Sequence, residues 1–163
     1  MKHIIFLILL ISCSSIKKLN DKIDHLMLIW QILEEAPSKQ WNKDILVSNM
    51  GYPKEKIPHP KKKNLTGWIY FNTENRFQEW GITINKNNIV DSVTYIPSGK
   101  YRPEFTIEKI MDRWNNLNCK KEEKQILTPH VIKKERFISC DSGKRIIHYN
   151  RYNEVESIFV KRQ

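Results

Sequence analysis

The apolar run Ile4–Ile11 near the start of the chain constrains the rest most strongly, because it decides which residues take part in the fold. It follows the basic residue Lys2 and ends at Ser12 and Cys13. A short positive start, an apolar stretch of about 7–15 residues and a small residue before the cut are typical of a secretory signal peptide. A transmembrane helix needs about 20 apolar residues, and this run has eight. We therefore expect residues 1–12 to be a signal peptide that is removed.

The last residues of this run, Leu10-Ile11-Ser12-Cys13, resemble the lipobox of bacterial lipoproteins. The resemblance implies cleavage before Cys13, a diacylglyceryl group on its thiol, and usually an acyl chain on the new amine. Two or more acyl chains, such as palmitate, give stable membrane attachment where one gives only marginal binding. The alternative is an ordinary secreted protein in which Cys13 lies near a different cleavage point.

Residues 13–20 are then expected to form a short polar, lipidated tether. Ser14 follows the cysteine, at the position where an aspartate would imply retention in the inner membrane. In a Gram-negative source, the resemblance therefore favours a lipid-anchored protein of the outer membrane that faces the periplasm.

Residues 13–163 have the size of one ordinary domain, and 40% apolar and 10% aromatic content are enough for a hydrophobic core. The net charge is +10, and the loss of Lys2 leaves +9. Such an excess indicates an anionic envelope component, an acidic protein or the membrane surface as a partner. It could equally reflect composition, because 21 of the 28 basic residues are lysines. Nucleic acid is not expected as a partner, since an exported protein rarely meets it.

Two further cysteines, Cys119 and Cys140, are predicted to form a disulfide. An isolated pair in an oxidising compartment usually does so. A metal site fits less well, because the pair lacks CxxC spacing and no histidine cluster accompanies it. A nucleophilic cysteine is weaker still. We expect no metal and no cofactor.

The first half of the chain predicts two helices followed by strands. Residues 21–36 carry apolar residues at helical spacing and precede Pro37, and residues 43–50 lie between a possible N-cap, Asn42, and Gly51. Residues 52–64 are rich in proline and lysine and predict an exposed loop. Residues 65–71, 76–84 and 89–96 alternate at strand period and are separated by polar turns.

The second half repeats this order. A helix is predicted over residues 106–118, and strands over residues 131–140, 144–150 and 154–161. The whole pattern predicts an α+β fold in which helices pack on an antiparallel meander. We expect one globular domain over residues 21–163. It could divide into two halves, residues 21–97 and 103–163, which share the order of helix followed by three strands.

No catalytic motif is present: the chain lacks GxSxG, HExxH, a glycine-rich phosphate loop and CxxC. His130 and His148 fall on adjacent predicted strands, and Glu154 and Glu156 share a strand face. These residues could serve acid–base catalysis, but scattered surface positions explain them as well. We therefore expect that the protein is not an enzyme.

The sharper candidate is a basic binding surface on the predicted loop. Lysines surround a histidine and a tyrosine there and precede a tryptophan, a combination that suits an acidic glycan, a phosphate-bearing lipid or an acidic protein. A solvated loop without a partner is the alternative. The residues are Tyr52, Lys54, Lys56, His59, Lys61, Lys62, Lys63 and Trp68.

Residues 41–96 resemble the small outer-membrane lipoproteins of the SmpA/OmlA (BamE-like) family and the related β-lactamase-inhibitor-protein fold. The resembling features are the lipidated Cys13, the helix ending Leu46-x-x-x-x-Gly51-x-Pro53, and Trp68-Ile69-Tyr70 at the start of the meander. The resemblance implies a pair of helices on a sheet and a binding role, either accessory to β-barrel assembly or inhibitory toward an enzyme. It assigns no functional residue beyond Cys13.

Together these features predict a membrane-anchored envelope lipoprotein that binds a protein or an anionic envelope component. The alternatives are a hydrolase acting on cell wall or glycan, and an inhibitor or immunity protein carried on the envelope. A pocket that gathers His130, His148 and a carboxylate would favour the hydrolase.

Overall fold

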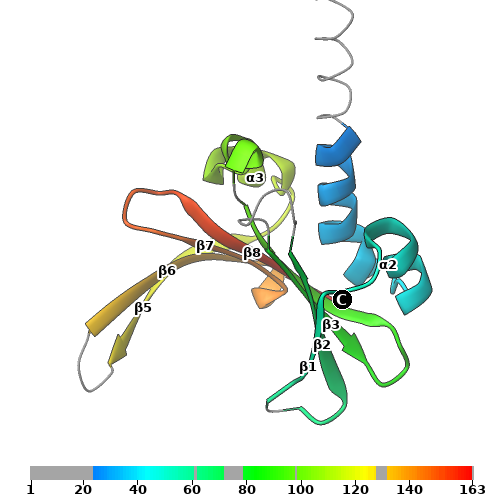
Figure 1. Cartoon of the computed structure of the whole chain (residues 1–163). Coiled ribbons are helices and arrows are strands. Elements are labelled where there is room, and N and C mark those ends of the chain that lie inside the picture. Colours follow the sequence, from blue (N-terminus) through cyan, green and yellow to red (C-terminus); the bar gives the residue numbers. More distant parts are fainter. Residues whose placement is uncertain (1–23, 61, 72–78, 98, 128–131, 163) are drawn as a thin grey trace, which may run out of the picture.

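A computed structural model describes residues 24–60, 62–71, 79–97, 99–127 and 132–162 (Figure 1). Eight antiparallel strands form one sheet in the order β1-β2-β3-β4-β8-β7-β6-β5. The mixed α+β class with an antiparallel sheet is thus as predicted. The strands are β1 (Glu55–Pro58), β2 (Leu65–Phe71), β3 (Glu79–Asn85), β4 (Val90–Ile96), β5 (Cys119–Leu127), β6 (Ile132–Cys140), β7 (Arg145–Tyr149) and β8 (Val155–Lys161).

Two helices precede the sheet. The described part of the N-terminal helix covers residues 24–38 and continues past Pro37, two residues beyond the predicted end. Proline removes one backbone donor, and near a helix end only one bond is lost. Helix α2 (Lys43–Met50) has the predicted bounds, because Asn42 caps its start by accepting from two backbone amides and Gly51 adopts a positive φ of 74° after it.

The helix of the second half is shorter than predicted. A 3-10 helix, η1 (Gly99–Glu104), precedes α3 (Ile107–Arg113), and Thr106 caps the start of α3 through its side chain. We predicted continuation to residue 118, but Asn115 and Asn116 follow the last turn, and asparagine competes with the helix by bonding to nearby backbone groups. A second 3-10 turn, η2 (Asp141–Gly143), joins β6 and β7.

The structure contains two strands that we did not predict, and both lie at the edges of the sheet. The predicted loop 52–64 contains β1, whose four residues are all exposed; prolines are tolerated on an edge strand because one side of it needs no ladder bonds. Strand β5 is the charged stretch after α3, and its charges are typical of protected edges. The other strands agree with prediction within a few residues.

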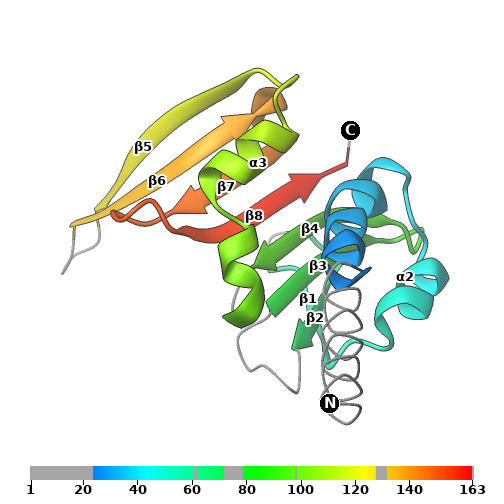
Figure 2. The ribbon, with the colours of Figure 1, turned by 90° about the horizontal axis from the view of Figure 1, so that it is seen from above.

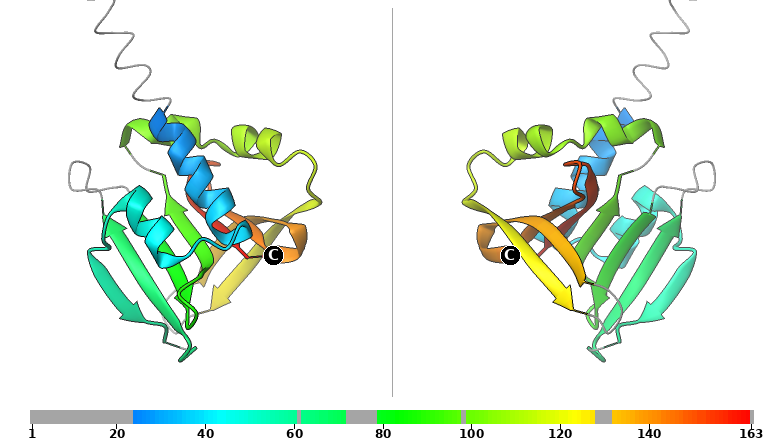
Figure 3. Two further views of the ribbon diagram at one scale, coloured as in Figure 1. Left: turned by 90° about the vertical axis from the view of Figure 1, so that its right-hand side faces the viewer. Right: turned by 90° about the vertical axis from the view of Figure 1, so that its left-hand side faces the viewer.

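One row of buried side chains crosses six neighbouring strands. The row consists of directly paired residues, each at most 8% exposed: Tyr70, Trp80, Tyr95, Ile158, Ile147 and Ile138. The Phe105 ring lies 5.0 Å from the Tyr95 ring and 5.0 Å from the Trp30 ring of the N-terminal helix. Phe105 therefore links the N-terminal helix to this face of the sheet, and Figures 2 and 3 show that helix on the same side of the sheet as α3.

The N-terminal helix runs beside β4 in the opposite direction. Its first described turn stacks His25 against Tyr101, which follows β4, with ring centres 6.0 Å apart. Beyond its last turn, the Trp41 carbonyl accepts a hydrogen bond from Val90 at the start of β4. The end of the helix and the C-terminus consequently meet at one end of the sheet, since the Arg162 amide donates to the Asp91 carbonyl. Figure 3 shows the helix descending toward the C-terminus.

Candidate binding surfaces

The residues of the predicted basic loop are divided between two places. Tyr52, Lys56 and Trp68 line one hollow, as described below, whereas Lys62 and Lys63 are exposed on the turn between β1 and β2. Lys54 is exposed and His59 is half-buried, and both have interactions with other residues. Lys61 lies outside the described residues. The division arises because β1 pairs with β2 and holds the two ends of the segment apart.

The hollow lies between α2 and the β1–β2 hairpin and has a volume of about 380 Å³. The Lys56 ammonium sits 4.8 Å from the centre of the Trp68 ring, a cation–π contact, and Tyr52 is 82% exposed at the rim. Sequence reasoning missed the contribution of α2: Lys43, Asp44, Val47 and Ser48. Because Trp68 is only 7% exposed and its ring is occupied by Lys56, this hollow is largely closed by its own side chains.

The sheet face opposite the buried row carries a second row of paired residues. These six side chains are all half-buried: Ile69, Gly81, Thr94, Phe159, Ile146 and Ser139. Figure 1 shows the sheet bent so that its two outer parts turn away from the helices, and no described helix covers the space between them. We call this face the open face. Its apolar and small residues are accessible in the described part of the chain.

Two glycines on the open face are not required by the local backbone. Gly67 and Gly81 lie in the interiors of β2 and β3 and have no positive φ, in contrast to Gly51 and Gly143. A Cβ at Gly67 would lie 3.5 Å from the Ile57 carbonyl oxygen, and one at Gly81 would lie 3.7 Å from Thr94 Cβ, which are ordinary contacts. Glycine inside a strand weakens it and often marks a place where another backbone or a ligand approaches.

Strand ends and turns gather cations at one end of the sheet. Because all neighbouring strands are antiparallel, one end of the sheet contains the β1–β2 turn, the β3–β4 turn, the β6–β7 turn, the start of β5 and the end of β8. We call the set the basic end: Lys62, Lys63, Lys86, Lys120, Lys144, Lys161 and Arg162. None of these side chains forms an ion pair with another described residue.

Several cations elsewhere on the sheet and its turns are held in ion pairs. Lys134 and Arg136 both pair with Glu123, at 2.9 and 3.1 Å, and Lys134 first, then Arg136, holds the pKa of Glu123 below its ordinary value. At the end opposite the basic end, Arg102 pairs with Glu154 at 3.3 Å. Among the described residues, the basic end holds seven cations without an ion pair, whereas the rest of the sheet and its turns hold fewer, such as Lys121, Lys124 and Arg151.

His148 and Glu156, two of the candidate acid–base residues, line one hollow of about 660 Å³ near the turn between β7 and β8. The His148 ring lies 5.8 Å from the Phe137 ring, and within the described residues no hydrogen bond joins it to Glu156. Glu154 turns to Arg102 and Asn150 instead. His130 lies outside the described residues. Among those described, no three His, Cys, Asp or Glu side chains are placed to hold a metal ion.

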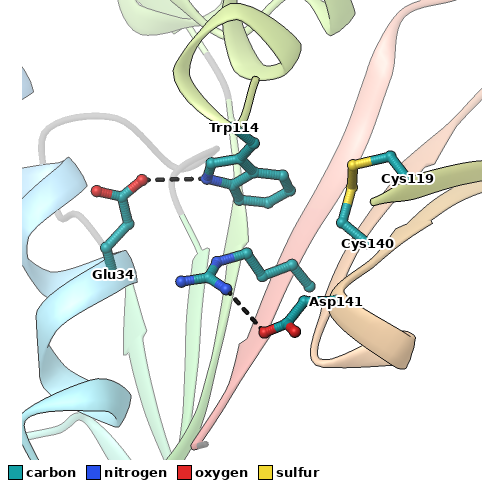
Figure 4. The surroundings of a disulfide bond; sticks show 6 residues. Glu34, Trp114, Cys119, Cys140 and Asp141 are labelled. Atoms are coloured by element: carbon teal, nitrogen blue, oxygen red, sulfur yellow. Dashed lines mark hydrogen bonds and ion pairs between the residues drawn. A yellow bond between two sulfur atoms is a disulfide. The ribbon is translucent and has the colours of Figure 1, made fainter. Parts of the chain in front are cut away.

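Cys119 and Cys140 form a disulfide between the paired ends of β5 and β6, as predicted (Figure 4). Beside it, Arg145 donates to Asp141 at 3.2 Å. Glu34 of the N-terminal helix accepts from Trp114 Nε1 at 3.1 Å and from Arg113 at 2.9 Å. These contacts tie the first helix to the second half of the chain and are structural in character.

Two buried tyrosines carry hydroxyl groups that have no hydrogen-bond partner in the described structure, Tyr70 and Tyr95. Burial raises the pKa of Tyr70 to about 12. Burial and the neighbouring Tyr101 raise the pKa of Tyr95 further. Both hydroxyl groups lie in the buried row and not on the open face. They therefore stay protonated through the neutral range and take no part in a surface site.

Within the described residues, no helix is long and apolar enough to span a bilayer. No protein-family model matches the chain, and no curated protein sequence does. Among solved structures, the chain is similar to a DUF4309 family protein (YjgB) from Bacillus subtilis subsp. subtilis str. 168. The TM-score is 0.48, and the identity is 13% over 80% of this chain and 84% of that chain. A likeness at this level carries no conclusion about function.

Proposed function

We propose that the protein is a lipid-anchored envelope lipoprotein that binds another protein on the open face of its sheet. Acylated Cys13 would hold it on the membrane, and residues 14–23 would connect the lipid to the N-terminal helix. The observation that carries the binding role is the open row Ile69-Gly81-Thr94-Phe159-Ile146-Ser139, half-buried and without a described helix over it.

The chemistry of this face supports a protein partner. Ile69 lies on one side of Gly81 and Thr94, and Phe159 and Ile146 lie on the other side. An apolar centre with few charges is typical of protein interfaces. The absence of a side chain at Gly81 lets the side chains of a partner approach the sheet closely. The resemblance to small envelope lipoproteins and to the inhibitor fold supports the same role.

We further propose that the two halves of the chain are equivalent units of helix and four-stranded meander. The strand order supports this division, because the last strands of the two meanders, β4 and β8, pair at the centre and the first strands, β1 and β5, form the two edges. Two such units side by side would produce one continuous binding face from both.

Mass spectrometry of the membrane fraction tests the anchor. The protein should begin at Cys13 and carry acyl chains, and a Cys13→Ala variant should keep its leader and lose them. An unmodified mature N-terminus in the wild-type protein would overturn the anchor, and with it the assignment to the envelope.

Site-specific photo-crosslinking tests the binding face. A photoreactive residue at Thr83 or Thr94 should give one discrete cross-linked protein, whereas the same residue at Gln31, exposed on the N-terminal helix, should not. A Gly81→Arg substitution should abolish the product, and a Gln31→Arg control should leave it unchanged. Equal cross-linking from both faces, or none from the open face, would refute the proposal.

A further inference from the structure

We infer that the basic end binds an acidic polysaccharide. The inference rests on the proposed envelope location, because that location supplies such polymers, but it concerns the strand ends that border the open face, where Lys120 pairs with Ser139 and Lys161 with Ser92. The cations of the basic end come from five separate turns and strand ends, so no single lysine-rich segment creates the patch.

The charges at this end are poorly compensated. The carboxylates present are Asp44, Asp91, Asp141 and Glu122, which lines one hollow together with Lys120 and Gly143. Asp141 is already paired with Arg145 at 3.2 Å. The remaining three stand against the seven cations of the basic end and Lys43, which lies beside the β3–β4 turn because its amide donates to the Asn88 carbonyl. An unbalanced cluster of this kind attracts an anion.

The cations are arranged as a row and not as a pocket. They sit at successive strand ends across the sheet, and eight strands about 4.8 Å apart extend over roughly 30 Å. A row of this length suits a linear polyanion that presents repeated charges. It does not suit a single small anion, which needs converging donors.

The side chains favour a hydrated polymer over other linear polyanions or an acidic protein. All but one are lysines. A lysine ammonium is a compact point charge, and it lacks the planar, two-pronged geometry by which arginine recognises a carboxylate or a nucleic-acid base. Tyr52, exposed beside Lys43 and Asp44, is a single aromatic ring near the basic end, whereas single-strand nucleic-acid binders stack successive bases on several such rings. A protein interface would also need an apolar centre, which this end lacks.

The position of the row relative to the proposed lipid anchor indicates on which side of the domain the polymer would bind. The first described turn of the N-terminal helix packs beside Tyr101, after β4, and the basic end lies at the start of β4. The lipid precedes that helix. The row therefore lies at the end of the domain remote from the start of the helix, and it is presented to a polymer beyond the surface of the anchoring membrane.

Titration of the intact lipoprotein, held in discs of zwitterionic lipid, against defined glycans tests the inference. Polygalacturonate provides carboxylates, heparin provides sulfates, and dextran of equal length is the neutral control. Both acidic glycans should bind and dextran should not. Binding should weaken steeply as salt is raised from low to physiological concentration.

Paired charge reversals locate the site. Lys86→Glu with Lys161→Glu should weaken binding of the acidic glycans at least tenfold. Lys124→Glu with Arg151→Glu makes the same change of net charge away from the basic end and should weaken it less than twofold. Gly81→Leu, which obstructs the open face without changing the net charge, should leave glycan affinity unchanged, so that failure of the open-face proposal and failure of this one give different results.

Four outcomes would overturn the inference. These are equal losses from the two charge-reversal pairs, equal binding of dextran, no saturable binding of either acidic glycan, and tighter binding of duplex DNA or polyglutamate at matched charge. A difference between polygalacturonate and heparin, with both lost in the Lys86/Lys161 pair, would support it and identify the preferred anionic group.

Discussion

The carboxylate of Glu34 accepts a hydrogen bond from Trp114 Nε1 at 3.1 Å, which joins the N-terminal helix to the residue that ends α3, 80 positions later. The same carboxylate accepts two bonds from Arg113, each at 2.9 Å. Arg113 in turn lies 4.5 Å from the centre of the Trp30 ring. Glu34 thus joins the first helix to the second half, alongside the contact of Trp30 with Phe105.

Replacing Glu34 by alanine should destabilise the protein by about 1–2 kcal/mol. Charge-assisted hydrogen bonds contribute about 1.5–3 kcal/mol when shielded, and Arg113 is 45% exposed, which reduces the figure. Urea unfolding followed by tryptophan fluorescence measures it. Glu35→Ala is the matched control, because the described partners of the Glu35 carboxylate, Lys39 and Gln31, are both exposed, and this change should cost less than half as much.

Removal of the disulfide should destabilise the chain by roughly 3 kcal/mol, because the bond restricts the unfolded chain over a sequence separation of 21 residues. The comparison is between the Cys119→Ala/Cys140→Ala double variant and the wild-type protein in urea. Adding a reductant should reproduce the loss in the wild-type protein and have no effect on the double variant. Equal midpoints for the two proteins would contradict the prediction.

The sequence patterns predicted the central strands and α2 because local signals agree there with the tertiary structure. Asn42 and Gly51 bracket α2 by capping geometry that depends on neighbouring residues alone. Edge strands carry no such signal. Strand β1 contains Pro58 and has four exposed residues, and β5 begins Cys119-Lys120-Lys121-Glu122, so hydrophobic alternation could not reveal either of them.

The two surfaces were harder to predict for the same reason. The basic end unites Lys62, Lys86 and Lys161, and their proximity depends on the strand order and on β1 and β5 as partners. The open row depends on the pairing of β4 with β8, two strands that are far apart along the chain. The sequence identified only residues of one local segment: Tyr52, Lys56 and Trp68 of the hollow, and Lys62 and Lys63 of the basic end.

Tyr95→Phe should stabilise the protein by about 1 kcal/mol at neutral pH. Its hydroxyl is fully buried and lacks a partner in the described structure, and an unsatisfied buried hydroxyl costs about 1–3 kcal/mol. Thermal unfolding measured by circular dichroism gives the comparison. A lower melting temperature in the variant would mean that the hydroxyl has a partner.

Stability should fall at alkaline pH through the buried tyrosines. Burial raises the pKa of Tyr70 to about 12, above the ordinary value near 10, so the folded state favours the neutral phenol. Its contribution is complete below pH about 10 and is lost as pH rises toward about 12. Urea midpoints measured from pH 8 to pH 11 should show this decline, and Tyr70→Phe should make it shallower.

Gly81→Ala should raise stability by about 0.5–1 kcal/mol while it weakens partner binding. Alanine restricts the unfolded chain more than glycine does, and its Cβ would meet only Thr94 Cβ, at an ordinary 3.7 Å. Gly51→Ala is the matched control: no atom lies within 4 Å of its Cβ, but its φ of +74° is strained for alanine, so stability should fall by about 1 kcal/mol.

Urea unfolding and the cross-linking yield from Thr94 are measured on the same preparations. If the fold requires the glycine, its substitution lowers the stability of the protein. If the glycine serves the approach of a partner, its substitution raises the stability of the protein and lowers the cross-linking yield. If Gly81→Ala unfolds more easily than the wild-type protein, the glycine serves the sheet itself and ceases to support the open face as a binding site.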